Sequence, residues 1–297
     1  MRTNPVYKRE TMVSARSFKL ALLLLSFNGI LAFVAFLNMY STLAQVRVTA
    51  EIQYTSFLDL YLFVATLEFA MLVLIMPAIT AGSISGERER QTLELMLTTR
   101  MRPVDIVLGK LEASISTMGL MIMSSFPIIA LVFVYGGVTV GDIAVLLLCF
   151  AAAALFAGSI GICCSALFGR TTLATVAAYA ILAAVVVGSC GLNQFVSYIN
   201  GMRLGSYLSS AVQVSARAGS GSFLYLLLIN PAVTFILAIS RLTGRAQAAA
   251  NVGQWFGNRA TGPIFSHWVV LSIVLQLVTA AALIWIAVRA VENGKKR

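Results

Sequence analysis

The chain has 297 residues, of which 59% are hydrophobic and 11% are charged, and its mean hydropathy is +0.91. A soluble globular protein carries about 25% charged residues, because polar groups must cover its surface. The composition therefore excludes that class and makes lipid the main solvent of this chain. With about 20 residues for each membrane-spanning helix, the length fits five to seven spans in a single membrane domain, 1–297, without a separate soluble catalytic domain.

The net charge is +10, and the positions of the lysines indicate what this charge does. They fall in the N-terminal region, one central loop and the C-terminal end, at Lys8, Lys19, Lys110, Lys295 and Lys296. Because basic residues are enriched in cytoplasmic loops, we expect all three regions, and hence both termini, to be cytoplasmic. No basic stretch alternates with exposed aromatic residues, so we do not expect nucleic-acid binding.

The N-terminal residues 1–19 precede the first apolar run, Leu20–Tyr40. On a helix their basic residues share one face: Lys8, Arg9, Arg16 and Lys19. This pattern predicts an amphipathic helix on the inner membrane surface, with its cations among anionic headgroups. The alternative is a frayed basic tail.

Further apolar runs follow in chain order, and the most charged stretch of the protein lies between the second run and the third. The runs are Phe57–Ile84, Leu111–Tyr135, a fourth that ends at Phe168, Leu173–Ile199 and Trp268–Val288. Small residues recur at every fourth position of the fourth run: Ala153, Ala157, Gly161 and Ser165. Such rows let helices approach closely. Together with the row of small residues, the six apolar runs predict an all-α integral membrane bundle of six transmembrane helices.

Residues 200–266 contain one more apolar run, Phe223–Ile239, which Asn230 and Pro231 interrupt. If this run were a full span, the chain would have seven spans and the C-terminal lysines would lie outside. The enrichment of basic residues on the cytoplasmic side opposes that arrangement. Proline also removes a backbone donor from a helix interior. We therefore predict two short re-entrant outer helices between spans five and six.

Glu68 is a carboxylate well inside the second apolar run. Such a group is costly in a membrane unless it is paired or hydrated, so it marks a candidate functional position. Two roles are open: Glu68 lines a translocation path, or it forms a hydrogen bond with a neighbouring helix in its neutral form.

Signatures of catalysis are not found in the sequence. Gly109 and Lys110 do not form a nucleotide-binding loop, because the upstream glycine is missing and Leu111 follows. The chain contains one histidine, His267, and neither an HExxH nor a GxSxG motif. We therefore expect a protein that is not an enzyme, with no catalytic, metal-binding or cofactor-binding residues of its own.

The segment 85–110, between spans two and three, has two stripes when it is drawn as a helix. The polar stripe contains Glu87, Arg90, Gln91 and Glu94, spaced so that Glu87–Arg90 and Arg90–Glu94 pairs can form. The apolar stripe contains Leu93, Met96 and Leu97. A short cytoplasmic helix of this kind suits a groove of a soluble partner. The alternative is an ordinary solvated loop.

The run AGSISGERERQTLELMLTTRMRPVDIVLGK, at 81–110, resembles the signature of the ABC-2 type permeases, the membrane subunits of ATP-binding-cassette exporters. The opening run from Asn4 to Glu10 is similar to the N-terminal amphipathic helix of that family, and the Asn230–Pro231 run is similar to its re-entrant outer helices. The sequence departs from the family pattern at Met96 and in its long, arginine-containing outer segment.

The resemblance implies a permease of the cell inner or plasma membrane that forms half of a translocation path. A separate cytoplasmic ATPase subunit would hold ATP and Mg²⁺, and a second permease copy or paralogue would complete the path. The cytoplasmic helix near Glu87 would be the coupling helix. Its contact residues, matched by position, would be Gly86, Glu87, Arg88, Thr92, Leu93 and Glu94.

Two other classes of function remain as alternatives. An ion- or proton-coupled secondary transporter would use Glu68 as its coupling site, although the repeated halves common in such carriers are not evident. A membrane-embedded assembly subunit would not transport at all. A co-purifying ATPase would distinguish the exporter from both.

Overall fold

The computed structural model describes residues 4–49, 54–98, 101–135, 139–207, 220–243 and 267–295, and within these ranges all regular structure is helical. The chain divides into two compact units, described separately below. The first contains Met1–Ile143, Ala154–Ala178 and Ala280–Arg297, and the second contains Ala144–Ala153 and Tyr179–Thr279.

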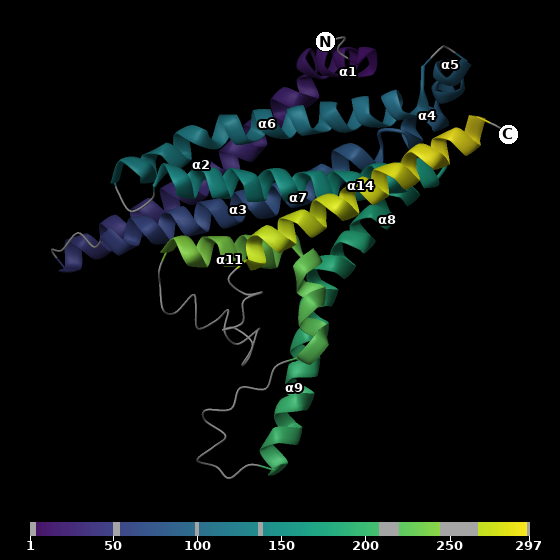
Figure 1. The fold of residues 1–297 in the computed structure, drawn as a ribbon. Coiled ribbons are helices and arrows are strands. Elements are labelled where there is room, and N and C mark those ends of the chain that lie inside the picture. The colour runs from purple at the N-terminus through teal and green to yellow at the C-terminus, as the bar shows by residue number, and fades with distance from the viewer. Residues whose placement is uncertain are drawn as a thin grey trace. The chain divides into compact units, whose positions relative to one another are not determined.

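The helices follow the predicted order (Figure 1). In chain order they are α1 Pro5–Ala15, α2 Phe18–Thr49, α3 Tyr54–Ala81, α4 Ser85–Glu89, α5 Thr92–Thr98, α6 Pro103–Tyr135, α7 Val140–Leu167, α8 Thr171–Ala183, the π-helix η1 Ala184–Gly188, α9 Ser189–Tyr207, the 3₁₀ helix η2 Gly221–Ile229, α11 Pro231–Thr243 and α14 Trp268–Lys295. Only helices and closed barrels satisfy their own backbone groups in lipid, which explains why a chain this apolar is helical.

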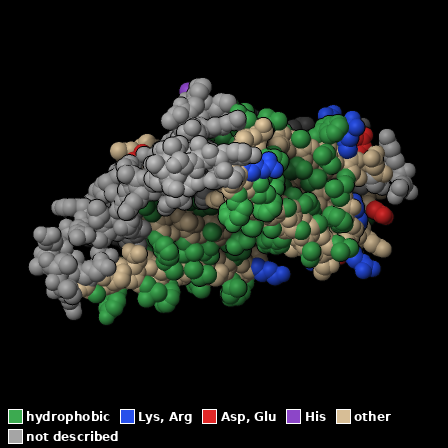
Figure 2. All heavy atoms as spheres, turned by 90° about the horizontal axis from the view of Figure 1, so that it is seen from below, with side chains coloured by type: hydrophobic (Ala, Val, Ile, Leu, Met, Phe, Trp, Pro, Cys, Tyr) green, Lys and Arg blue, Asp and Glu red, His purple; other side chains and the backbone are tan. Residues whose placement is uncertain are grey.

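Among the described residues, six helical stretches are long and apolar enough to cross a membrane, which confirms the predicted all-α fold with six candidate spans. They are Phe18–Ser41, Tyr61–Glu89, Pro103–Pro127, Val140–Leu167, Thr171–Arg203 and Trp268–Asn293. Hydrophobic side chains cover much of the described part of the face seen in Figure 2. On α2, for example, Leu25, Phe36 and Tyr40 are largely exposed, as expected for side chains that lipid surrounds.

The expectation of one amphipathic helix over 1–19 is wrong in one respect, because two helices share this range. Helix α1 ends at Ala15 and α2 begins at Phe18. The Ser17 hydroxyl accepts a hydrogen bond from the Lys19 amide, so Ser17 starts a new helix and does not continue the first. The basic side chains of the range therefore do not lie on one continuous helical face.

In the first unit, α3 and α7 pack at very short range through the small residues of α7. A Cβ atom on Gly161 would collide with the Thr80 hydroxyl and lie 3.2 Å from the Ala81 amide nitrogen. Ala157 and Ser165 are also fully buried. The predicted row of small residues thus includes a contact that only glycine permits.

In the second unit, η2 and α11 meet at an angle of 93° on either side of Asn230. The Asn230 side-chain carbonyl oxygen accepts the Ala232 amide at 2.9 Å, and its side-chain amide donates to the Val186 carbonyl at 2.9 Å and to the Ser189 hydroxyl at 2.8 Å. Pro231 begins α11, where its missing amide hydrogen costs nothing. Asn230 therefore fixes the corner and joins it to η1 and α9.

The chain bends sharply at Asn230 and Pro231, and the predicted re-entrant course of the two helices stays a prediction. Helix α11 is also joined to α14, because the Thr234 hydroxyl forms hydrogen bonds with Ser272 and Gln276. Of the predicted outer segment 200–266, residues 208–219 and 244–266 lie outside the described residues.

The contact between α3 and α7 predicts that Gly161→Ala destabilises the protein. Because the added methyl group meets the Thr80 side chain and the α3 backbone, we expect a cost of about 1–3 kcal/mol and a lower Tm of the detergent-purified chain. Gly119→Ala on α6 is the matched control, since a Cβ atom on Gly119 would meet no neighbouring atom within 4 Å. Equal melting of the two variants would contradict the close contact.

Candidate functional site

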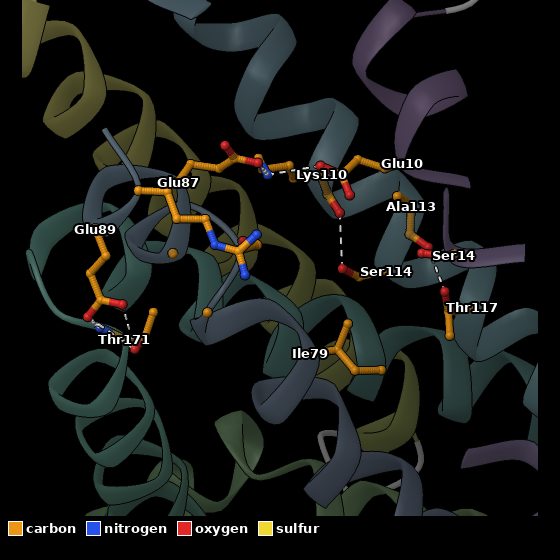
Figure 3. Close-up of a pocket in the computed structure, with 14 residues that line it drawn as sticks. Glu10, Ser14, Ile79, Glu87, Glu89, Lys110, Ala113, Ser114, Thr117 and Thr171 are labelled. Carbon is orange, nitrogen blue, oxygen red and sulfur yellow. Dashed lines mark hydrogen bonds and ion pairs between the residues drawn. The ribbon is translucent and has the colours of Figure 1, made fainter. Parts of the chain in front are cut away.

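A polar pocket of about 480 Å³ lies in the first unit, beside the charged segment that contains α4 and α5 (Figure 3). Residues of α1, α3, α4 and α6 and the first residue of α8 line it. They are Glu10, Ser14, Ile79, Gly82, Ser83, Gly86, Glu87, Glu89, Arg90, Lys110, Ala113, Ser114, Thr117 and Thr171. Among the described residues, no group of three or more histidine, cysteine or acidic side chains could hold a metal ion.

The charged segment is not one helix, so the two stripes drawn along it do not form. Helix α4 ends at Glu89, and Gln91 has a φ of 58°, in the left-handed region that non-glycine residues rarely adopt. Helix α5 then begins at Thr92. Because the chain turns at Gln91, Glu87 bonds with Lys110 and does not pair with Arg90 along a helix.

Lys110 is the buried centre of the pocket wall, with 4% of its side chain exposed. Its Nζ lies 3.0 Å from Glu10 Oε1 of α1 and 3.5 Å from Glu87 Oε1 of α4, as Figure 3 shows. Glu87 also accepts a hydrogen bond from the Thr92 hydroxyl at the start of α5. Lys110 therefore joins three helices by charge-assisted contacts, and each carboxylate offsets part of the cost of burying the ammonium group.

Gly109, the residue before Lys110, lets α1 pack closely on α6. A Cβ atom on Gly109 would lie 2.9 Å from both the Asn4 side-chain nitrogen and the Val6 Cβ. Asn4 caps α1 by accepting the Val6 amide at 3.0 Å, and it donates to the Asp105 carbonyl of α6 at 2.6 Å. The Gly–Lys pair at the end of the 81–110 run thus has a structural role: the glycine permits the contact and the lysine bonds across it.

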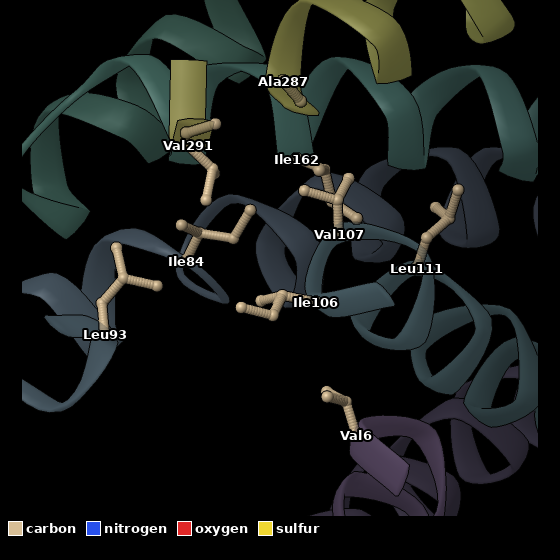
Figure 4. Close-up of a cluster of buried hydrophobic side chains, with 10 residues drawn as sticks. Val6, Ile84, Leu93, Ile106, Val107, Leu111, Ile162, Ala287 and Val291 are labelled. Carbon is tan, nitrogen blue, oxygen red and sulfur yellow. The ribbon is translucent and has the colours of Figure 1, made fainter. Parts of the chain in front are cut away.

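An apolar cluster lies next to these polar contacts (Figure 4). Its buried members come from α1, α3–α4, α5, α6, α7 and α14: Val6, Ile84, Leu93, Ile106, Val107, Leu111, Ile162, Ala166, Ala287 and Val291. Met96 packs against the same cluster and is partly buried. The apolar residues that the sequence assigned to a partner surface therefore point in part into the protein itself.

Helix α4 has partners at both ends, on α7 and α8. At its start, the Ser165 hydroxyl of α7 accepts the amide hydrogens of Ile84 and Ser85, each at 2.9 Å. At its end, Arg88 donates to the Ala166 carbonyl at 3.1 Å and Glu89 accepts the Thr171 amide at 2.8 Å. A helix of five residues is too short to be stable alone, so these contacts explain why it forms.

The six residues assigned to the ATPase contact divide into an inward and an outward group. Glu87 and Arg88 bind Lys110 and Ala166, and Leu93 is buried in the apolar cluster. Gly86 is half-buried, facing the methyl group of Thr171. The outward group, Thr92 and Glu94, is exposed, and so are Arg90, Gln91 and Leu95, the last with 71% of its surface.

Glu68 lies between α3 and α6 and is fully buried. The Ser125 hydroxyl donates to one of its carboxyl oxygens and also lies 2.9 Å from the Ile122 carbonyl of its own helix. Glu68 is not among the residues that line the pocket described above.

Several residues of the site were missed in the sequence, namely Glu10, Glu89, Ser165 and Thr171. Glu10 and Glu89 sit inside the runs that resemble the family, but their partners are 100 and 82 residues away along the chain. Ser165 was noted as a small packing residue, and nothing local indicates that its hydroxyl caps another helix. Only the folded arrangement brings these residues together.

The position of Lys110 predicts that Lys110→Gln destabilises the first unit. The variant leaves Glu10 and Glu87 beside a neutral group, and we expect a loss of about 2 kcal/mol in the free energy of unfolding, measured as a lower Tm. Lys8→Gln, at an exposed position of α1, is the control and should melt like the parent. A Lys110→Gln protein as stable as the control would show that the lysine does not hold the three helices together.

Comparison with known proteins agrees with the geometry. The family model described as ABC-2 family transporter protein matches residues 35–289, a range that begins within α2, ends within α14 and contains the α4–α5 segment. No curated protein matches the chain. Permeases of this family are membrane transport components and associate with an ABC ATPase subunit. The chain therefore belongs to the ABC-2 transporter family and is a multi-pass membrane permease of an ABC-type transporter.

Proposed function

We propose that this permease is one half of an exporter and that a separate cytoplasmic ATPase subunit drives it by docking on the α4–α5 segment. A second copy or a paralogue completes the translocation path. ATP and Mg²⁺ bind in the ATPase subunit, and this chain contributes the path and the surface that receives the nucleotide-driven movement.

The observation that carries the proposal is the exposed tip of the α4–α5 segment. Arg90, Gln91, Glu94 and Leu95 are exposed there, while the neighbouring residues bind inside the permease. Leu95 is a large aliphatic side chain that is exposed next to the charged Glu94, on a segment that is otherwise anchored, and we take it as the apolar centre of a protein contact with a polar rim. Leu95 and Glu94 are the pair we assign to the centre of this contact.

The distribution of lysine supports a cytoplasmic position for this tip and for both termini. In that orientation the bent pair η2 and α11 enters and leaves the membrane on the outer side, since a seventh crossing would separate the termini. Helix α1 then lies at the inner surface, where its exposed Lys8 and Arg9 face anionic headgroups.

Glu68 has, in this proposal, the second of its two roles, a hydrogen bond between neighbouring helices. Its partner Ser125 belongs to α6, so the bond joins the two helices that carry the charged segment between them. A secondary transporter would need Glu68 to exchange its proton or ion with water during each cycle. The full burial of the side chain offers no support for that use.

The docking surface is tested by charge reversal and by polar substitution at the tip. Glu94→Arg and Leu95→Asp should each weaken binding of the purified ATPase subunit by about tenfold or more, because both lie at the centre of the contact. Binding is measured by titrating the ATPase subunit onto the permease in nanodiscs. Insertion and Tm should not change, because neither side chain is buried.

Glu112→Arg is the matched control, since Glu112 is an exposed carboxylate that belongs to α6 and not to the α4–α5 segment. It should bind the ATPase subunit like the parent. Unchanged binding of both tip variants would refute docking at the α4–α5 segment, and equal weakening by Glu112→Arg would show that net charge, not the tip, determines the affinity.

A further inference from the structure

Two consecutive residues at the end of α4, Arg88 and Glu89, bind the two sides of one turn. Arg88 donates from Nη2 to the Ala166 carbonyl in the last turn of α7, at 3.1 Å. Glu89 accepts the Thr171 amide at 2.8 Å and the Thr171 hydroxyl at 3.1 Å, at the first residue of α8. Residues 168–170 form the turn between these two helices.

The order of the two charges matches the polarity of the helix ends they meet. The carbonyl end of a helix carries partial negative charge and the amide end partial positive charge. Arg88 therefore lies at the end that favours a cation, and Glu89 lies at the end that favours an anion. Each also bonds a backbone group that has no partner within its own helix.

Ser165, from the same region of α7, adds two hydrogen bonds to the start of α4, from the Ile84 and Ser85 amides. Helix α4 is thus held at its first residues by α7 and at its last residues by α7 and α8. Because the helix has only five residues, it cannot shift without breaking these bonds or carrying the turn with it.

We infer that Arg88 and Glu89 are positioning residues that make the α7–α8 turn move together with α4. A displacement of the α4–α5 segment then reaches the ends of α7 and α8 directly, in addition to α3 and α6, which continue from the segment along the chain. The inference rests on the proposed function, because it takes the ATPase subunit as the source of the displacement. It assigns Arg88 and Glu89 to transmission inside the permease and not to contact with the ATPase.

The test reports movement of α8 by a spin label. A cysteine replaces Leu173, an exposed residue in the first turn of α8, in a background without the four native cysteines. The labelled permease is assembled with its ATPase subunit in nanodiscs, and the label's mobility is recorded by EPR before and after addition of ATP and Mg²⁺. We expect an ATP-dependent change in the parent, and none in Glu89→Ala.

Thr171→Pro breaks the same contact from the other side. Proline fits the backbone at the first residue of a helix, and here it removes both the amide hydrogen and the hydroxyl that bond Glu89. The first backbone bond of α8, from the Ala174 amide to the Arg170 carbonyl, does not involve the Thr171 amide and can remain. The ATP-dependent change should be lost here too. Glu89→Gln keeps an acceptor oxygen for the Thr171 amide and should retain the change, while Glu112→Ala is a control on α6.

The outcomes separate this inference from the function on which it rests. A parent permease that binds no ATPase subunit overturns the proposed function, and the inference with it. Normal ATPase binding with a retained label response in both Glu89→Ala and Thr171→Pro overturns the inference alone. Weaker ATPase binding in Glu89→Ala but not in Thr171→Pro also overturns it, since Glu89 would then contact the ATPase itself.

Discussion

The backbone groups at helix ends constrain this protein more than any other feature. A helix leaves its first amide and last carbonyl groups without partners, and an apolar surrounding offers no water to replace them. Around α4 in the first unit, polar side chains from distant segments supply the partners of several helix ends. Ser165 serves the start of α4, Arg88 the end of α7 and Glu89 the start of α8. In the second unit, Asn230 does the same at the corner between η2 and α11.

The same requirement explains how a short charged segment becomes a defined structure. Helices α4 and α5 have five and seven residues and would not persist alone. Lys110 bonds α4 to α1 and α6, the apolar cluster buries Leu93, and the bonds to α7 and α8 hold the rest. In the proposed function, a surface anchored on so many sides receives the movement of the ATPase subunit and transmits it to several membrane helices.

Much of the fold could be predicted from the sequence, because hydropathy over about 20 residues detects membrane helices directly. The six candidate spans and the bend at Asn230 belong to this part. The turn at Gln91 could not be predicted, since residues other than glycine rarely adopt its left-handed φ. The site depends on pairs distant in sequence, such as Glu89 with Thr171, 82 residues apart. The resemblance over 81–110 located the segment, while the inward direction of Glu87, Arg88 and Leu93 required the folded chain.

In the proposed mechanism, α4 and the α7–α8 turn move together as one rigid unit. Cryo-electron microscopy of the permease with its ATPase subunit, in nucleotide-free and ATP-bound states, tests this most directly. The Arg88–Ala166 and Glu89–Thr171 contacts should be present in both states, with the ends of α7 and α8 displaced together with α4. A map in which α4 moves while α8 stays in place, with the Glu89–Thr171 contact broken, would contradict the claim.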